Sequence, residues 1–288
     1  MLKTPARNNG GVSLATHVED ILILAKTYPS PSAQYVETSC VAGINADGVM
    51  RRLYPVPFRL IEESQQFGKW QWITVRVEKA RKDHRPESHR IFIDTVISGT
   101  KVDTRKDWIN RWPWINRIPT FEDPVSLDKR RLMDQTSLAL LKPKRVLALE
   151  ITPARHPDWT DAEKEKLTQE QIQGNLFSED EARHQIAELR KIPFDFHYRY
   201  VCDTPDGEQE FRSKIVDWEA GALYWNCVRS HGPSWEAPFR KRLEDDLPTK
   251  NLIFMVGNQH RFQSQWLIIS LIYPMQPQAE LSEQSSLF

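Results

Sequence analysis

The sequence predicts an α+β fold: an N-terminal small curved or barrel-like β-sheet with short helices, followed by a C-terminal α+β part with antiparallel hairpins. Three observations lead to this prediction. Short runs rich in β-branched and aromatic residues follow one another before residue 100. The turn sequence Asn45-Ala46-Asp47-Gly48 lies between two of these runs and is typical of a hairpin. A second strand–turn–strand pattern follows residue 190 and precedes amphipathic helical segments.

In the first half, the continuous apolar run Ile21–Ala25 indicates a buried strand. Residues 35–44 and 49–54 are the expected strands on either side of the hairpin turn. Residues 71–80 alternate between apolar and polar side chains, which predicts a half-exposed strand with Trp72 and Arg76 on its outer face. Arg59–Phe67 has a helical composition, and Gly68 follows as a candidate C-cap.

In the second half, Ser126–Leu141 is expected to be a helix and Val146–Ile151 a strand. Residues 194–201 and 210–216 flank the turn Asp203–Gly207, which predicts a hairpin. Asp217 is expected to cap a following helix, because its carboxylate can accept the unpaired N–H groups of the first turn.

Composition divides the chain into five expected segments. They are a flexible leader at residues 1–19, a basic, aromatic-rich β-containing domain at 20–157, a polar linker at 158–178, an α+β domain at 179–274 and a disordered tail at 275–288. The formal net charge of zero hides an asymmetry between these segments. Residues 51–117 carry fifteen Lys and Arg against eight Asp and Glu, a balance of 15 − 8 = +7, whereas residues 158–219 balance at 8 − 16 = −8.

Positive charge interleaved with aromatic rings indicates nucleic-acid binding, because cations contact phosphates and flat rings stack on bases. We therefore predict a DNA- or RNA-associated protein of repair, replication, or mobile-element or defence biology. The residues expected to form this surface are Lys26, Arg51, Arg52, Arg59, Lys69, Trp70, Trp72, Arg76, Arg85 and Arg90. The tryptophan-rich stretch Lys106–Arg117 fits either base stacking or a hydrophobic plug that closes the sheet.

Two other function classes stay open. The chain could be an enzyme, a hydrolase or nuclease acting on a nucleotide or modified base, since two groups of ionisable residues fit general acid–base chemistry. These candidate catalytic residues are Asp83, His84, Glu87 and His89 in one segment and Asp217 and Glu219 in another. The segment at 83–90 fits an exposed turn that balances its own charge equally well. The third class is a non-catalytic protein-interaction module with an acidic surface.

Three widely spaced cysteines argue against a disulfide framework and for a reducing cytoplasm. No apolar run approaches the roughly 18 residues that a membrane span needs, so no membrane association is expected. The sequence contains neither a glycine-rich phosphate loop nor His or Cys pairs at zinc-site spacing, so we predict no metal site and assign no cofactor.

The chain ends in Gln284-Ser285-Ser286-Leu287-Phe288. This pattern resembles the short peptide with which bacterial polymerases and repair proteins dock on the DNA sliding clamp. The resemblance covers five residues and implies that the Gln284 amide forms hydrogen bonds while Leu287 and Phe288 fill an apolar pocket. A second copy of the pattern occurs at Gln173–Phe177. The bacterial sliding clamp is thus an expected partner.

Overall fold

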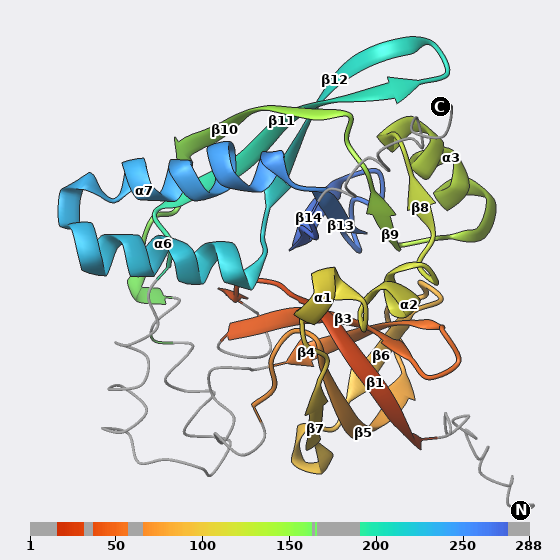
Figure 1. Ribbon diagram of the computed structural model, residues 1–288. Coiled ribbons are helices and arrows are strands. Elements are labelled where there is room, and N and C mark those ends of the chain that lie inside the picture. The colour runs from red at the N-terminus through yellow and green to blue at the C-terminus, as the bar shows by residue number, and fades with distance from the viewer. Residues whose placement is uncertain (1–15, 32–36, 57–65, 163–164, 166–190, 276–288) are drawn as a thin grey trace, which may run out of the picture.

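Two β-sheets with related strand order make up the structure, a computed structural model that describes residues 16–31, 37–56, 66–162, 165 and 191–275 (Figure 1). The first sheet contains seven strands before residue 102. They are β1 (His17–Lys26), β2 (Ser30–Pro31), β3 (Glu37–Asn45), β4 (Met50–Val56), β5 (Gln71–Lys79), β6 (Ser88–Ile91) and β7 (Ile97–Lys101).

Five strands of this sheet close into a barrel. They pair in the order β1-β3-β4-β6-β5, and β5 pairs again with β1. The β4–β6 pair is parallel and the other pairs are antiparallel. This is the strand order of the OB-fold, a five-stranded Greek-key barrel. The β3–β4 hairpin turns at Gly48, whose φ of +87° suits glycine.

The second sheet repeats this order with its first strand split in two. Its strands are β8 (Thr120–Phe121), β9 (Leu138–Leu141), β10 (Arg145–Pro153), β11 (Phe194–Thr204), β12 (Gly207–Ile215), β13 (Ile253–Asn258) and β14 (Trp266–Ile272). They pair in the order β10-β11-β12-β14-β13-β9-β8, with β12 and β14 parallel. β9 and β10 are consecutive in the chain and together take the place of the first strand, since β10 pairs with β11 and β9 pairs with β13. The second sheet therefore has the topology of a second OB-type barrel.

The helices are short and lie mainly around the second sheet (Figure 1). The α-helices whose bounds lie within the described residues are α1 (Arg105–Trp108), α2 (Trp112–Ile115), α3 (Pro124–Asp134), α6 (Trp218–His231) and α7 (Glu236–Arg240), and α7 continues as a π-helix at Lys241–Asp246. Asp217 caps α6 as predicted, accepting a hydrogen bond from the Glu219 amide at 3.0 Å. The predicted fold class, a barrel-like sheet with short helices followed by an α+β part with a hairpin, is confirmed.

Three apolar cores hold the molecule together: one inside each barrel and one between them. β1 serves two of these cores, because Ile21 and Ile23 point into the first barrel while Leu22 and Leu24 point into the core between the barrels. This explains why residues 21–25 form a continuous apolar run rather than an alternating one.

The predicted helix over residues 126–141 is only partly present. α3 ends at Asp134, and Gln135 takes a left-handed conformation with φ of 61°. Leu138–Leu141 instead form β9, which is buried on both faces: Leu138 and Leu140 join the core between the barrels, while Ala139 and Leu141 join the core of the second barrel. The apolar spacing in this segment therefore reflects a two-sided strand rather than a helix face.

The sheets divide the chain at a different point from the expected linker at 158–178. β10 was expected in the first domain, but it pairs with β11 along its whole length. The change from one sheet to the other falls between Lys101 and Thr120, in the segment of α1 and α2. Residues 1–15 of the expected leader, most of the expected linker and the tail from residue 276 lie outside the described residues. The leader was expected to extend to residue 19, but β1 already begins at His17.

Candidate functional site at the barrel junction

Several of the basic side chains predicted to contact nucleic acid lie buried between the barrels. Arg52, 4% exposed, donates to the Ser137 carbonyl at 2.7 Å. Arg85, 6% exposed, donates to the Asn258 carbonyl at 2.7 Å. In an OB-fold, the second and third strands and the loop between the fourth and fifth strands contact ligands. In the first barrel these are β3, β4 and the loop before β6, and the second barrel covers them.

Other members of that predicted set lie on the outer surface of the first barrel. Arg51 pairs with Glu19 at 2.7 Å. Arg76 and Arg90 both lie over the Phe92 ring, at 4.4 and 5.1 Å. Trp72, by contrast, packs edge-on against Trp114 at 4.9 Å, and both rings pack against the core between the barrels. Arg59 lies outside the described residues. The predicted basic surface is thus divided between the junction and a face directed away from it.

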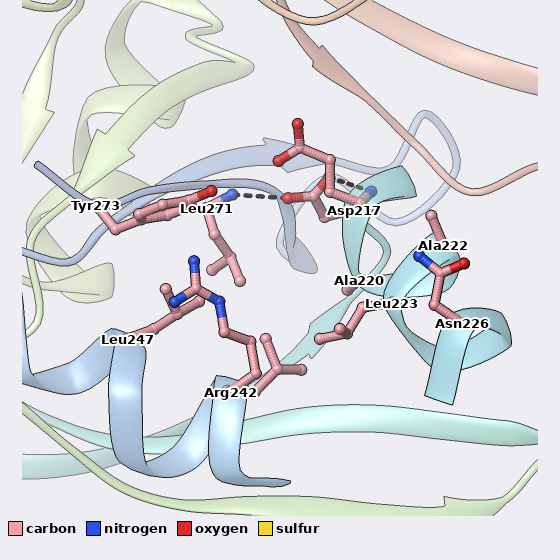
Figure 2. Close-up of a pocket in the computed structure, with 11 residues that line it drawn as sticks. Asp217, Ala220, Ala222, Leu223, Asn226, Arg242, Leu247, Leu271 and Tyr273 are labelled. Atoms are coloured by element: carbon pink, nitrogen blue, oxygen red, sulfur yellow. Dashed lines mark hydrogen bonds between the residues drawn. The ribbon is translucent and has the colours of Figure 1, made fainter. Parts of the chain in front are cut away.

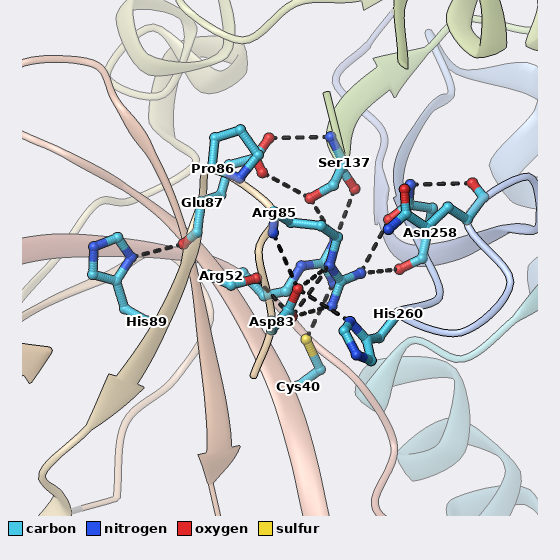
Figure 3. A network of polar contacts seen from close by, with 12 residues as sticks. Cys40, Arg52, Asp83, Arg85, Pro86, Glu87, His89, Ser137, Asn258 and His260 are labelled. Carbon is cyan, nitrogen blue, oxygen red and sulfur yellow. Dashed lines mark hydrogen bonds and ion pairs between the residues drawn. The ribbon is translucent and has the colours of Figure 1, made fainter. Parts of the chain in front are cut away.

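The predicted catalytic segment 83–89 lies between β5 and β6 of the first barrel and contacts the second barrel through side chains (Figure 3). Asp83 pairs with Arg85 at 2.5 Å and accepts a hydrogen bond from Ser88 at 2.8 Å. Burial raises the pKa of Asp83, but the bonds from Arg85 and Ser88 outweigh it and hold this pKa well below its usual value. His260 of the second barrel lies 3.2 Å from the same carboxylate.

Glu87 accepts hydrogen bonds from the Ser137 amide at 3.1 Å and from the Ser137 hydroxyl at 2.8 Å (Figure 3). His89 is 8% exposed, and its Nδ1 lies 2.8 Å from the Glu87 carbonyl. His84 is exposed. The acids of this segment are therefore occupied by contacts that hold the barrels together.

A second ionic cluster at the junction brings together residues from two of the predicted sets. The Lys69 Nζ lies 2.7 Å from Glu219 and 3.5 Å from Asp217, and it donates to the Leu271 carbonyl at 3.2 Å. Burial raises the pKa of Asp217. Burial lowers the pKa of Lys69, but the carboxylates of Asp217 and Glu219 raise this pKa by more. The pKa of Lys69 therefore lies above its ordinary value. Burial also lowers the pKa of the nearby Lys26 to about 8.

A pocket of about 290 Å³ opens beside this cluster (Figure 2). Its walls come from α6, from the helical segment after α7 and from the end of β14. The lining residues are Asp217, Glu219, Ala220, Ala222, Leu223, Asn226, Arg242, Leu243, Leu247, Leu271 and Tyr273. We call this the junction pocket. Figure 2 shows the Arg242 guanidinium directed toward Leu271 and Tyr273.

Three cations surround the aromatic side of the junction pocket. Arg242 and Lys250 lie over the Tyr273 ring at 5.2 and 5.5 Å. Tyr273 packs on Trp108 at 5.6 Å, and Arg111 lies over Trp108 at 4.7 Å. We call these five residues the Tyr273 cluster. Within the described parts of the chain, Arg111, Arg242 and Lys250 take part in no ion pair.

The backbone beside Arg111 is strained. The Arg111 guanidinium also lies over Trp70, at 4.6 Å. Trp70 and Trp108 have φ values of 61° and 66°, in the left-handed region that bulky residues rarely adopt. The Trp70 indole nitrogen is buried and has no hydrogen-bond partner among the described residues. Such strain is concentrated at functional sites in proteins, so it favours a functional site on this side of the junction.

Within the part of the chain that the structure describes, the cations on the exposed face of β10, β11 and β12 form ion pairs, unlike those of the Tyr273 cluster. The cations of this face are close to carboxylates: Arg212 to Glu150 at 2.7 Å, Arg199 to Glu210 at 2.6 Å and Lys214 to Asp195 at 2.6 Å. This face therefore neutralises its own charge. It occupies the position that contacts ligands in an OB-fold, yet it offers a polyanion little net attraction.

The described residues contain no group of three or more His, Cys, Asp or Glu placed to hold a metal ion. None of the helices in the described part of the chain is long and apolar enough to span a membrane. The binding residues predicted from the sequence do not include Arg111, Arg242, Lys250 or Tyr273. The first belongs to the tryptophan-rich stretch and the second to a basic helix segment, but no pattern in the sequence relates them to each other.

The fold and the junction define a class: α+β proteins built from two OB-type barrels in tandem. The first barrel matches the family model described as domain of unknown function DUF8758 over residues 17–117. The model described as domain of unknown function DUF8757 matches residues 122–288, more than half of the chain. The chain therefore belongs to the DUF8757 family. The border between the two matched regions coincides with the change of sheet.

No curated protein matches the chain. Among solved structures, a chain from "Structure and Conformational Change of a Replication Protein A Heterotrimer Bound to ssDNA" is similar at 8% identity and a TM-score of 0.26. The alignment covers 91% of this chain and 66% of that one, so the present chain spans slightly less than two thirds of its length. So distant a likeness establishes neither fold nor function.

Proposed function

We propose that this protein binds nucleic acid and that the Tyr273 cluster is the surface that contacts it. The observation that carries the proposal is the gathering of three cations around two packed rings, with no carboxylate paired to them among the described residues. Arg242 and Lys250 lie over the partly exposed Tyr273, and Arg111 lies over its neighbour Trp108. Burial lowers the pKa of Arg111 to about 10, so its guanidinium stays charged at neutral pH. Cations of this kind attract the phosphate backbone, and the ring offers a surface for stacking.

The faces of the two barrels that would bind ligands in an OB-fold are less suited to binding a polyanion than the Tyr273 cluster is. The face of the first barrel that would bind ligands in an OB-fold is covered, and Arg52 and Arg85 are bonded to the second barrel there. The corresponding face of the second barrel is a ladder of ion pairs. The Tyr273 cluster combines accessible charge with aromatic surface and is not neutralised in this way.

The double variant Arg242→Ala/Lys250→Ala tests the proposal. Removing two phosphate-contacting charges should weaken binding of a labelled oligonucleotide about tenfold or more at low salt and reduce the slope of log affinity against log salt by about two. Fluorescence anisotropy titrations at several salt concentrations measure both quantities. DNA and RNA strands of the same sequence, each single-stranded and as a duplex, are the probes.

The matched control is Lys144→Ala/Arg145→Ala, which removes the same formal charge from a different place. Lys144 and Arg145 are already paired with Glu208, at 2.7 and 2.9 Å, so this change should alter affinity by less than about twofold. Equal losses in both double variants would contradict a specific role for the Tyr273 cluster. Binding by the unsubstituted protein that is indifferent to salt would contradict phosphate recognition itself.

A catalytic role for Asp217 and Glu219 stays a prediction, as does one for the segment 83–89. In both places the carboxylates are engaged by cations of the same chain, with Lys69 and Arg85 in direct contact. Nothing in the junction selects a reaction over simple binding, so binding is the function we propose. A role as a non-catalytic protein-interaction module also stays a prediction.

The sliding clamp also stays a predicted partner, because Gln284–Phe288 and the inner copy at Gln173–Phe177 both lie outside the described residues. Deleting residues 284–288 should abolish capture by an immobilised bacterial sliding clamp without changing the melting temperature. The matched control replaces Ser285 and Ser286, the variable positions of the pattern, with alanine and should bind as before. Undiminished capture of the deleted protein would remove the tail as the docking element.

A further inference from the structure

We propose that the junction pocket receives one unpaired nucleobase, so that the protein prefers single strands over duplexes. This inference rests on the proposed nucleic-acid binding at the adjoining Tyr273 cluster. The pocket and the cluster share Arg242 and Tyr273, so a strand whose phosphates lie along the cations has a cavity immediately beside it.

The pocket has the apolar surface that a base requires. Its lining includes Ala220, Leu223, Leu243, Leu247 and Leu271. A base leaving a stack exposes two flat faces, and contact with apolar and aromatic side chains compensates for the lost stacking. The volume of about 290 Å³ is of the order of a single ring system rather than a peptide or a folded partner.

Polar groups on the pocket walls can hydrogen-bond the edge of a base. The side chain of Glu219 is 51% exposed and presents acceptor oxygens. Asn226 uses its Oδ1 to accept a hydrogen bond from Arg229, which leaves its amide N–H groups to donate. On the opposite wall, the Tyr273 hydroxyl and the Arg242 guanidinium have no hydrogen-bond partner among the described residues. Acceptors and donors thus face a cavity with an apolar floor.

Preference for single strands follows from this geometry. In a duplex the base is stacked on both sides and its edge is paired, so entry into the pocket requires the base to flip out at a considerable energetic cost. In a single strand much of that cost is absent. Phosphate contacts alone would not distinguish the two forms, because both carry the backbone.

The first experiment compares two single strands that differ only in their bases. Wild-type protein is titrated with a labelled mixed-sequence DNA strand of about twenty nucleotides and with an abasic strand of the same length and charge. We expect the strand with bases to bind about tenfold more tightly than the abasic strand. Equal affinity for the two strands would overturn the inference and the stacking part of the proposed function, and leave phosphate recognition by the cations of the Tyr273 cluster standing. If the wild-type protein binds neither strand nor duplex, the proposed function itself fails.

The second experiment fills the pocket. Ala222→Phe places a ring into it from α6 and should reduce affinity for the strand with bases about tenfold, with abasic and duplex affinities unchanged within about twofold. Ala237→Phe adds the same ring at an exposed position of α7 outside the pocket lining and should change none of them. Unchanged affinity of Ala222→Phe for the strand with bases would also overturn the inference. If this variant lacks a cooperative thermal transition, the abasic comparison on the wild-type protein decides alone.

Discussion

Replacing Asp217 with alanine is expected to lower the free energy of unfolding by about 4 kcal/mol, because it removes the buried one of the two carboxylates beside Lys69 and leaves two backbone amides without their acceptor. The Asp217 side chain is 1% exposed. It accepts hydrogen bonds from the amides of Glu219, at 3.0 Å, and Leu271, at 2.9 Å, and lies 3.5 Å from the Lys69 Nζ. One carboxylate thus caps α6, holds the end of β14 and balances a buried charge, so a single substitution removes all three contacts.

Chemical denaturation at neutral pH measures this loss. Glu219→Ala is the matched control, because Glu219 contacts the same Lys69 but is half-exposed. Exposed ion pairs contribute little, so the control should lose less than about 1 kcal/mol. Similar losses in the two variants would show that burial of Asp217 is not the source of the effect. If Asp217→Ala is destabilised as expected, a loss of activity in this variant would reflect unfolding and would not by itself support a catalytic role for Asp217.

Replacing Asp83 with asparagine is expected to cost about 2–3 kcal/mol at pH 7, because the buried Arg85 loses its counter-charge at the contact between the barrels. The pKa of Asp83 is depressed in the folded protein from an ordinary value near 3.8. The unfolded chain therefore binds a proton there at a higher pH than the folded chain does. The stabilisation is fully present above about pH 4 and is lost as the pH falls toward the depressed pKa.

Denaturation curves at pH 7, pH 5 and pH 3 should therefore show a stability difference between the wild-type protein and Asp83→Asn that is nearly the same at pH 7 and pH 5 and is smaller, though not abolished, at pH 3. Asp245→Asn changes an exposed carboxylate and serves as the control, with an expected difference below about 0.5 kcal/mol. A stability difference between wild type and Asp83→Asn that persists undiminished to pH 3 would contradict a charge-based role for Asp83.

Local patterns predicted individual elements well where one face of a strand is buried and the other is not. Ile73, Val75 and Val77 alternate with polar residues, and the structure buries them in the first barrel. Arg76 lies outside this barrel and is partly exposed, whereas Trp72 packs against the core between the barrels. The same reasoning failed for Leu138–Leu141, because a strand covered on both faces loses the period of two and is hard to distinguish from a helix segment.

The candidate site was less predictable than the fold. The density of basic residues between residues 51 and 117 predicted a binding surface there, but the density does not indicate what each cation contacts. Arg52 and Arg85 belong to that dense stretch and are buried against the second barrel. Arg111 and Tyr273 are far apart in the chain, yet both pack on Trp108.

The amino-acid sequence by itself determined the class of fold, the hairpins and the cap of α6, because these depend on residues that are neighbours in the chain. Only the tertiary structure decided which charges remain available. The docking of one barrel on the other pairs or buries some cations and leaves Arg242 and Lys250 beside an open pocket. Charge compensation depends on distance in space, and the core between the barrels sets that distance.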